Sequence, residues 1–178
     1  MLSLVPARLP RSEPLPRLVA AIGPRRARVA LLAGCVQSAL APKIAHATIR
    51  VLARNGVEVM VPPGQGCCGA LALHAGDLSL ARGLARPLLD AFPAEVDAVI
   101  CNAAGCGSAM KEYGLLFAHD ADEARARALA SKTRDVTEFL ADLGLLSPPA
   151  LDAPLVVAYH DACHLVNAQR VAAAPRDL

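Results

Sequence analysis

Gly64-Gln65-Gly66-Cys67-Cys68-Gly69 is the stretch that decides the fold of this chain. Neighbouring side chains on an extended strand point to opposite faces, so a strand would separate two adjacent cysteines. A glycine-lined loop can turn both sulfurs toward one point, because glycine adopts backbone angles that other residues avoid. The stretch therefore predicts a loop that presents two thiols to a metal or to an iron–sulfur cluster.

The same arrangement, an apolar run followed by cysteine, occurs twice more. Cys35 follows the run at 29–32, Cys106 follows the run at 98–100, and the paired cysteines follow the run at 57–61. If these runs are parallel strands, the cysteines lie at their carboxyl ends, where open α/β sheets place their binding crevices. We expect four cysteines to form one metal or cluster site: Cys35, Cys67, Cys68 and Cys106.

The composition indicates a globular protein. Of the 178 residues, 54% are apolar and 19% are charged, which is enough apolar content for one buried core. A net charge of +2 and only 3% aromatic residues argue against a nucleic-acid-binding surface. No apolar stretch approaches the roughly 18 residues that span a bilayer. Six cysteines without a signal peptide indicate a reducing cytoplasm rather than a disulfide framework.

The order of the elements predicts an α/β fold: a Rossmann-like three-layer domain with a mainly parallel sheet. Residues 1–27 contain five prolines and are expected to form a linker or extended arm. Strands are expected at 28–33, 57–61 and 97–101. Helices are expected at 42–54, from Gly69 onward with an apolar stripe of Leu80, Leu84, Leu88 and Leu89, at 105–113, across the exposed polar stretch 120–134, and at 137–144.

The last part of the chain partly repeats the first. Residues 29–35 and 157–163 align without gaps as a strand, a small residue and a cysteine. We therefore expect a first domain at 28–146 and the opening of a second, truncated copy at 154–178. That copy begins with a strand at 155–159 and a helix, and Cys163 is its first cysteine.

Four segments of the chain resemble the cysteine-rich CCG domain family, which includes subunits of heterodisulfide reductases, lactate-utilisation proteins and glycolate oxidase. The segments are RVALLAGCVQ (28–37), GQGCCGAL (64–71), NAAGCGSAMKEYG (102–114) and HDACHL (160–165). The segment at 102–114 points to the glycolate oxidase branch of the family.

The resemblance implies an iron–sulfur cluster, of the 4Fe-4S type, held by the four cysteines of the first domain, with Cys163 binding cofactor in the second copy. It also implies a subunit without catalytic residues of its own. Such a subunit relays electrons from flavin-containing subunits, which oxidise glycolate or another 2-hydroxy acid, toward a membrane-associated respiratory acceptor. The implied location is the cytoplasm, with peripheral attachment to the inner face of the membrane.

The chain departs from the family pattern at three places. No ferredoxin-like cysteine runs precede Cys35, so Met1 is expected to be an internal start. The C-x-x-C motif retains Cys106 but has Ala103 at its first position, and Cys101 is expected to pack in the core. The second copy has no CCG, so the chain is expected to end inside a domain.

Several other interpretations remain open at this point. The same cysteines suit a redox-silent zinc module, a thiol–disulfide enzyme of the heterodisulfide reductase kind, or the remnant of a broken gene. The loop also fits G-x-G-x-x-G, with Asp90 about 20 residues on, but Pro62-Pro63 and the two thiols argue against a dinucleotide site. His74 and His164 flank the motifs, and His160 beside Asp161 is expected to be structural.

Overall fold

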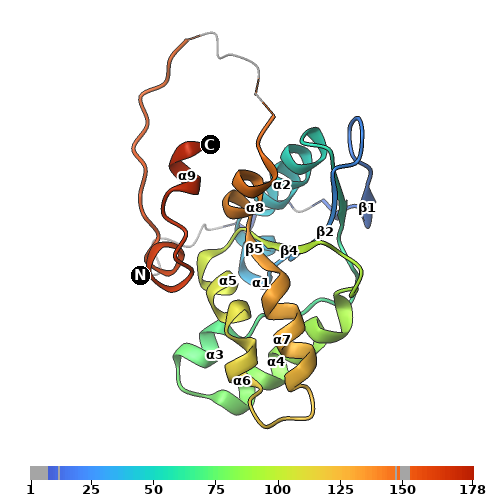
Figure 1. Cartoon of the computed structure of the whole chain (residues 1–178). Coiled ribbons are helices and arrows are strands. Elements are labelled where there is room, and N and C mark those ends of the chain that lie inside the picture. The colour runs from blue at the N-terminus through green and yellow to red at the C-terminus, as the bar shows by residue number, and fades with distance from the viewer. Residues whose placement is uncertain (1–7, 12, 147, 149–152) are drawn as a thin grey trace.

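The fold is a five-stranded sheet with helices on both faces (Figure 1). This computed structural model describes residues 8–11, 13–146, 148 and 153–178. The strands are β1 (Leu18–Val19), β2 (Ala27–Leu31), β3 (Val57–Met60), β4 (Ala98–Cys101) and β5 (Thr133–Asp135). The helices are α1 (Cys35–Leu40), α2 (Pro42–Arg54), α3 (Ala70–His74), α4 (Leu78–Ala91), α5 (Ala104–Lys111), α6 (Tyr113–Leu116), α7 (Glu123–Lys132), α8 (Val136–Leu143), the π-helix η2 (His164–Ala168) and α9 (Ala174–Asp177).

Three parallel strands form the centre of the sheet. The strand order is β1-β3-β2-β4-β5, and β2 pairs in parallel with both β3 and β4. In this register, Val29 lies opposite Val59 on one side and Ala98 on the other. The loops that follow the three strands therefore leave from the same edge of the sheet. The predicted α/β class with a mainly parallel sheet is confirmed.

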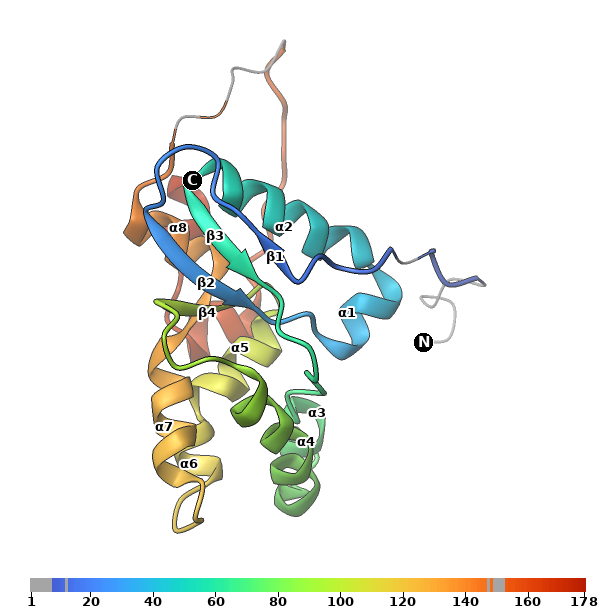
Figure 2. The ribbon, with the colours of Figure 1, turned by 90° about the vertical axis from the view of Figure 1, so that its right-hand side faces the viewer.

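The central strands separate two apolar cores because their side chains alternate between the faces. On β2, Val29 and Leu31 pack with α2 and α8, whereas Ala30 packs with α4, α5 and α7. On β4, Ala98 and Ile100 face the first core. Figure 2 shows α2 running along β3, away from α4, α6 and α7. This arrangement gives the predicted three layers.

Helix α2 has the predicted bounds. The turn that follows it requires a glycine, Gly56, for a steric reason. Pro42 occupies the first turn, where a missing backbone N–H costs nothing. Gly56, just beyond the helix, has a φ of +76°. A Cβ atom at this position would lie 2.9 Å from the Pro24 carbonyl oxygen, so the turn into β3 requires glycine.

The helix predicted from Gly69 onward is in fact two helices. α3 ends at His74, and α4 begins after Asp77, whose carboxylate accepts a hydrogen bond from the Leu80 N–H at 2.9 Å. Leu80 lies in the first turn of α4, is 52% exposed, and is not part of the apolar stripe. In the described residues, no helix combines the length and the apolar character needed to cross a bilayer.

Two short strands of the structure are absent from the prediction. β1 lies within the segment 1–27, expected to be a linker or arm, and pairs antiparallel with β3. β5 lies at the end of the stretch 120–134, expected to be helical, and pairs in parallel with β4. Each has only two or three residues, which is too few to show an alternating pattern.

The strand predicted at 155–159 is wrong. Residues 154–162 have no regular structure, and the side chains of Val156 and Val157 are exposed. The apolar pattern of this run is typical of a buried strand, but no sheet strand of the described residues pairs with it. Residues 147 and 149–152, between the two predicted domains, lie outside the described residues.

The start of α8, directly after β5, is held by a capping box whose contribution to stability can be measured. Asp135 accepts a hydrogen bond from the Thr137 N–H, and Glu138 accepts one from the Asp135 N–H, which together form a capping box. Asp135→Ala removes one half of this box and is expected to lower the free energy of unfolding by about 1 kcal/mol. Urea denaturation followed by circular dichroism measures the change.

Asp142→Ala is the matched control, because Asp142 is an exposed residue on the same helix. It is expected to change stability by less than about 0.5 kcal/mol. Equal effects of the two substitutions would show that the capping box does not stabilise the start of α8.

Candidate functional site

Cys35 and Cys67 meet although they follow different strands. Cys35 is the first residue of α1 and follows Gly34, whose φ is +72°, after β2. Cys67 lies in the loop that follows β3. Their Sγ atoms are 3.5 Å apart. The parallel pairing of β2 and β3 brings the two loops to one edge, as the sequence predicts.

Gln65 joins the CCG loop to the end of β2. Its Nε2 donates to the carbonyl oxygens of Leu31 and Pro62, and its Oε1 accepts from the Ala33 N–H, each at 3.0 Å. One side chain thus bridges the two loops that carry Cys35 and Cys67. Sequence reasoning missed this role, for which the only signal is an amide residue between two glycines.

The glycine of the CCG motif is required by packing against α4. Gly69 has a φ of +77°, and a Cβ atom here would lie 2.6 Å from the Ala81 carbonyl oxygen. Its N–H also points at the Cys67 Sγ, 3.4 Å away. The buried Tyr113 hydroxyl donates to the Cys68 carbonyl oxygen at 2.7 Å and fixes the other side of the loop. Sequence reasoning did not identify Tyr113.

All four predicted thiols line one cavity of about 470 Å³. Its walls come from the loops after β2 and β3, from the start of α5, and from η2 near the C-terminus. The lining residues are Gly34, Cys35, Val36, Gln37, Cys67, Cys68, Ala70, Leu71, His74, Ala103, Gly105, Cys106 and His164.

The other two cysteines do not line this cavity. Cys101 is buried in the core, as predicted, and its Sγ lies 3.3 Å from the Ala103 carbonyl oxygen. Cys163 is exposed and lies beside the lining residue His164 in the chain. Its assignment to the site of a second copy stays a prediction.

Three of the lining thiols have raised pKa values. Burial, followed by the hydrogen bond with Cys67, raises the pKa of Cys35. A hydrogen bond with Cys106, followed by burial, raises the pKa of Cys68. A hydrogen bond with Cys101 is the main reason that the pKa of Cys106 rises to about 12. These thiols are protonated at neutral pH, so a metal that binds them as thiolates displaces their protons.

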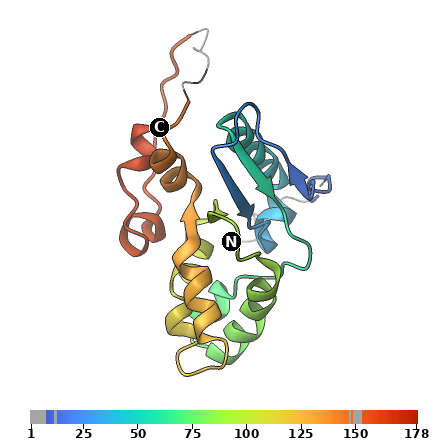
Figure 3. The same ribbon diagram turned by 45° about the vertical axis from the view of Figure 1, so that its right-hand side comes forward.

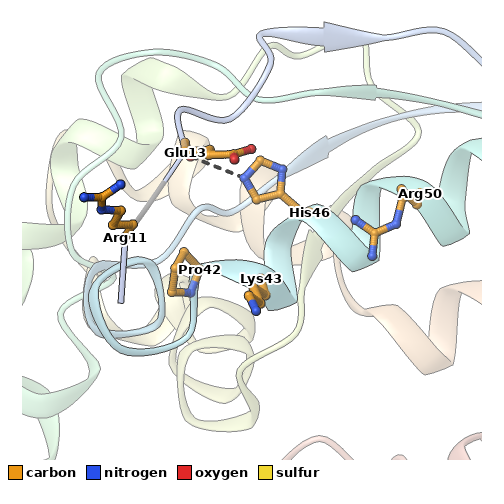
Figure 4. A pocket seen from close by; sticks show the side chains of 6 residues that line it. All are labelled: Arg11, Glu13, Pro42, Lys43, His46 and Arg50. Carbon is orange, nitrogen blue, oxygen red and sulfur yellow. Dashed lines mark hydrogen bonds between the residues drawn. The ribbon is translucent and has the colours of Figure 1, made fainter. Parts of the chain in front are cut away.

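A second cavity, of about 330 Å³, lies beside α2 and contains no cysteine (Figure 4). It is lined by basic side chains, with Lys43, His46 and Arg50 on α2 and Arg11 on the arm. The His46 ring makes a hydrogen bond of 3.3 Å with the Glu13 carbonyl oxygen. Because this cavity has no sulfur ligand, it is separate from the thiol site.

A comparison with family models finds one match that covers these features. Residues 29–111 match the family described as Cysteine-rich domain, CCG. The domain of residues 29–111 belongs to the cysteine-rich CCG family. The match includes most of β2, all of β3 and β4, and all four thiols of the cavity, so the family and the site coincide in the chain.

Relatives of known sequence extend the similarity beyond the CCG domain. The chain is 38% identical over 176 residues to the probable glycolate oxidase iron–sulfur subunit of Bacillus subtilis, covering 96% of this chain and 40% of that protein. It is 36% identical over 179 aligned positions to the glycolate oxidase iron–sulfur subunit of Escherichia coli, covering 94% of this chain and 41% of the relative. Lactate utilization protein A of Geobacillus kaustophilus is 31% identical, with 83% of this chain and 62% of that protein covered.

The chain thus spans about two fifths of the glycolate oxidase relatives that it matches. No solved structure shows a significant match.

The close contact at Gly69 predicts a large cost for any side chain there. Gly69→Ala forces a left-handed backbone on alanine and places a methyl group against the Ala81 carbonyl oxygen. We expect the free energy of unfolding to fall by about 2 kcal/mol or more in urea denaturation.

Gly83→Ala is the matched control, because Gly83 lies within α4 and a Cβ atom there meets nothing within 4 Å. This substitution is expected to raise stability by about 0.5–1 kcal/mol, since alanine favours the helix. If Gly69→Ala were equally harmless, the contact between the CCG loop and α4 would be disproved.

Proposed function

We propose that this chain is an iron–sulfur electron-transfer subunit of a flavin-linked 2-hydroxy-acid oxidase, with glycolate as the substrate of the complex. One observation carries the proposal: four thiols from three strand ends line a single cavity. The names of the relatives agree with it, since the proteins of Bacillus subtilis and Escherichia coli are named glycolate oxidase iron–sulfur subunits.

The donor set suits an iron–sulfur cluster. Cys35, Cys67, Cys68 and Cys106 supply four soft sulfur ligands, the number that clusters of the 4Fe-4S type take from proteins. When bound, such a cluster accepts and donates single electrons, which links two-electron flavin chemistry to an acceptor. The Gly69 N–H beside the Cys67 Sγ stabilises negative charge on that sulfur.

The donors do not form a ready-made site for a single zinc ion in the described residues. A structural zinc ion needs four donor atoms within about 2.0–2.3 Å of one point. In the described part of the chain, no three Cys, His, Asp or Glu side chains gather closely enough to hold one ion. The Sγ atoms of Cys35 and Cys67 are 3.5 Å apart, a separation that either kind of centre can use, so metal analysis of the purified chain decides between zinc and a cluster.

The remaining parts of the chain fit a subunit of a larger complex. We assign residues 1–27 to a linker or arm that adds β1 to the edge of the sheet, 28–146 to the first CCG domain, and 154–178 to the opening of a second copy. The flavin-containing subunits are the proposed electron donor, and a respiratory acceptor at the inner face of the membrane is the proposed destination. The chain itself supplies no catalytic residue in this scheme.

Iron and acid-labile sulfide, measured per chain after purification without oxygen, test the proposal. We expect both in stoichiometric amounts, with a brown visible absorbance that bleaches on reduction. Cys106→Ala removes a lining thiol and is expected to lose most of the iron. Cys163→Ala is the matched control, since Cys163 is outside the cavity, and it is expected to retain the iron.

Three results would contradict the proposal. Zinc in place of iron would identify a redox-silent module. Retention of the full cluster in Cys106→Ala would show that the cavity thiols are not the ligands. Reoxidation of the reduced protein by a disulfide substrate would point instead to a thiol–disulfide enzyme.

A further inference from the structure

The charge of this chain is unevenly distributed along the sequence. Residues 1–57 contain nine Lys and Arg residues and a single acidic residue, Glu13, whereas residues 58–178 contain nine Lys and Arg residues and 15 Asp and Glu residues. The formal net charge of +2 therefore combines a strongly basic first part with an acidic remainder. An asymmetry of this kind indicates that the basic part faces an anionic partner.

Three of these cations line the basic cavity beside α2 without a counter-charge of their own. Arg25 and Arg28 pair with Glu58, but Arg11, Lys43 and Arg50 make no ion pair in the part of the chain that the structure describes. All three are exposed to solvent. Like charges that are held close together repel one another, so an anion that enters the cavity is stabilised by all of them.

A contact between the arm and α2 closes one side of this cavity. The ring of His46 makes a hydrogen bond with the backbone carbonyl oxygen of Glu13, at 3.3 Å (Figure 4). Glu13 also supplies the one carboxylate of the lining, which leaves an excess of positive charge among the lining residues. The volume of about 330 Å³ is far larger than the roughly 30 Å³ that a water molecule occupies in the liquid, so a phosphate group fits.

The solvent-facing side of α2 carries an apolar stripe beside the basic one. Lys43, Arg50 and Arg54 recur at spacings that place them on one face of the helix. Ile44 and Val51 follow Lys43 and Arg50 directly in the chain, and they are 44% and 42% exposed. The opposite face of α2 packs into the core. A basic stripe next to exposed apolar residues is typical of a helix that lies at a membrane surface.

The openness of the cavity favours a lipid headgroup over a small soluble anion. Sites for small molecules usually enclose most of the ligand, whereas the cations of this cavity are exposed. Figure 3 shows β1, which continues the arm, and the C-terminal segment on opposite sides of the molecule. A surface that binds the arm would therefore leave the C-terminal segment accessible.

We propose that the basic cavity binds the phosphate headgroup of an anionic phospholipid and attaches this face of the chain to a membrane surface. Arg11, Lys43 and Arg50 contact the phosphate, while Ile44 and Val51 enter the boundary between headgroups and acyl chains. This inference goes beyond the proposed function, and it does not depend on the iron–sulfur cluster.

Flotation of the anaerobically purified full chain with lipid vesicles tests the site. We expect the chain to float with vesicles that contain phosphatidylglycerol and to stay unbound with vesicles of phosphatidylcholine alone. Binding is expected to weaken as the salt concentration is raised, because mobile ions screen exposed charges.

Arg50→Gln removes one cation of the cavity and is expected to weaken binding to the anionic vesicles about fivefold. Arg127→Gln is the matched control, because Arg127 is an exposed cation on α7 and does not line the cavity. It lowers the net charge by the same amount and is expected to leave the binding within about twofold of the unsubstituted chain.

Two further variants separate the contributions of charge and apolar contact. Glu13→Gln keeps the backbone carbonyl that contacts His46 but removes the carboxylate, so it is expected to strengthen binding, a result that misfolding cannot produce. Ile44→Gln leaves the charge unchanged, and it is expected to weaken binding to vesicles without changing the salt dependence.

The alternatives give different results. Equal binding to both kinds of vesicle, or equal losses in Arg50→Gln and Arg127→Gln, overturns recognition of the headgroup by this cavity. Calorimetric binding of inorganic phosphate by a chain that does not float with vesicles overturns the lipid and identifies a site for a soluble anion. Retention on immobilised polyglutamate without vesicle binding overturns it in favour of an acidic protein.

The flotation result is also independent of the metal analysis. A chain that contains iron and sulfide but does not bind anionic vesicles overturns this inference and leaves the proposed function standing. A chain that binds the vesicles but contains no iron overturns the proposed function alone.

Discussion

The parallel pairing of β2 with β3 and β4 is the constraint on which the rest of the structure depends. It places the segments that follow the three strands on one edge of the sheet, and these segments, a loop after β3 and the starts of α1 and α5, carry all four thiols of the cavity. The alternating side chains of the same strands fill both apolar cores, so one set of residues holds the sheet between its helices and sets the position of the site. Cys35 and Cys67 are far apart in the sequence, so local structure does not bring their side chains together. The pairing of β2 with β3 does.

A small number of polar contacts turns this general placement into a defined site. Gln65 ties the CCG loop to the end of β2, and Tyr113 holds the carbonyl group of Cys68. Both side chains act on the backbone and leave the thiols free to bind a metal. Buried hydrogen bonds of this kind cost stability when one partner is missing, so they keep a loop in one conformation. The glycine of the motif completes the arrangement, because α4 passes too close for any other residue.

The C-terminal segment changes the interpretation of the site. A CCG domain alone provides thiols, whereas this chain folds residues 164–171 back onto α5 and adds an imidazole to the same cavity. The site therefore depends on two parts of the sequence that resemble the openings of two repeats.

The sequence by itself determined the α/β class, the three central strands, helix α2 and the four cysteines that gather at one edge. Each of these rests on local signals: apolar runs, a proline and a glycine at the ends of α2, and cysteines placed after strands. Only the tertiary structure decided that β1 and β5 join the sheet, that residues 155–159 form no strand, and that His74 stacks on His164. The physical reason is the same in each case. A strand of two or three residues, an apolar run without a partner, and a pair of distant rings have no periodic pattern of their own, so they are defined only by what packs against them.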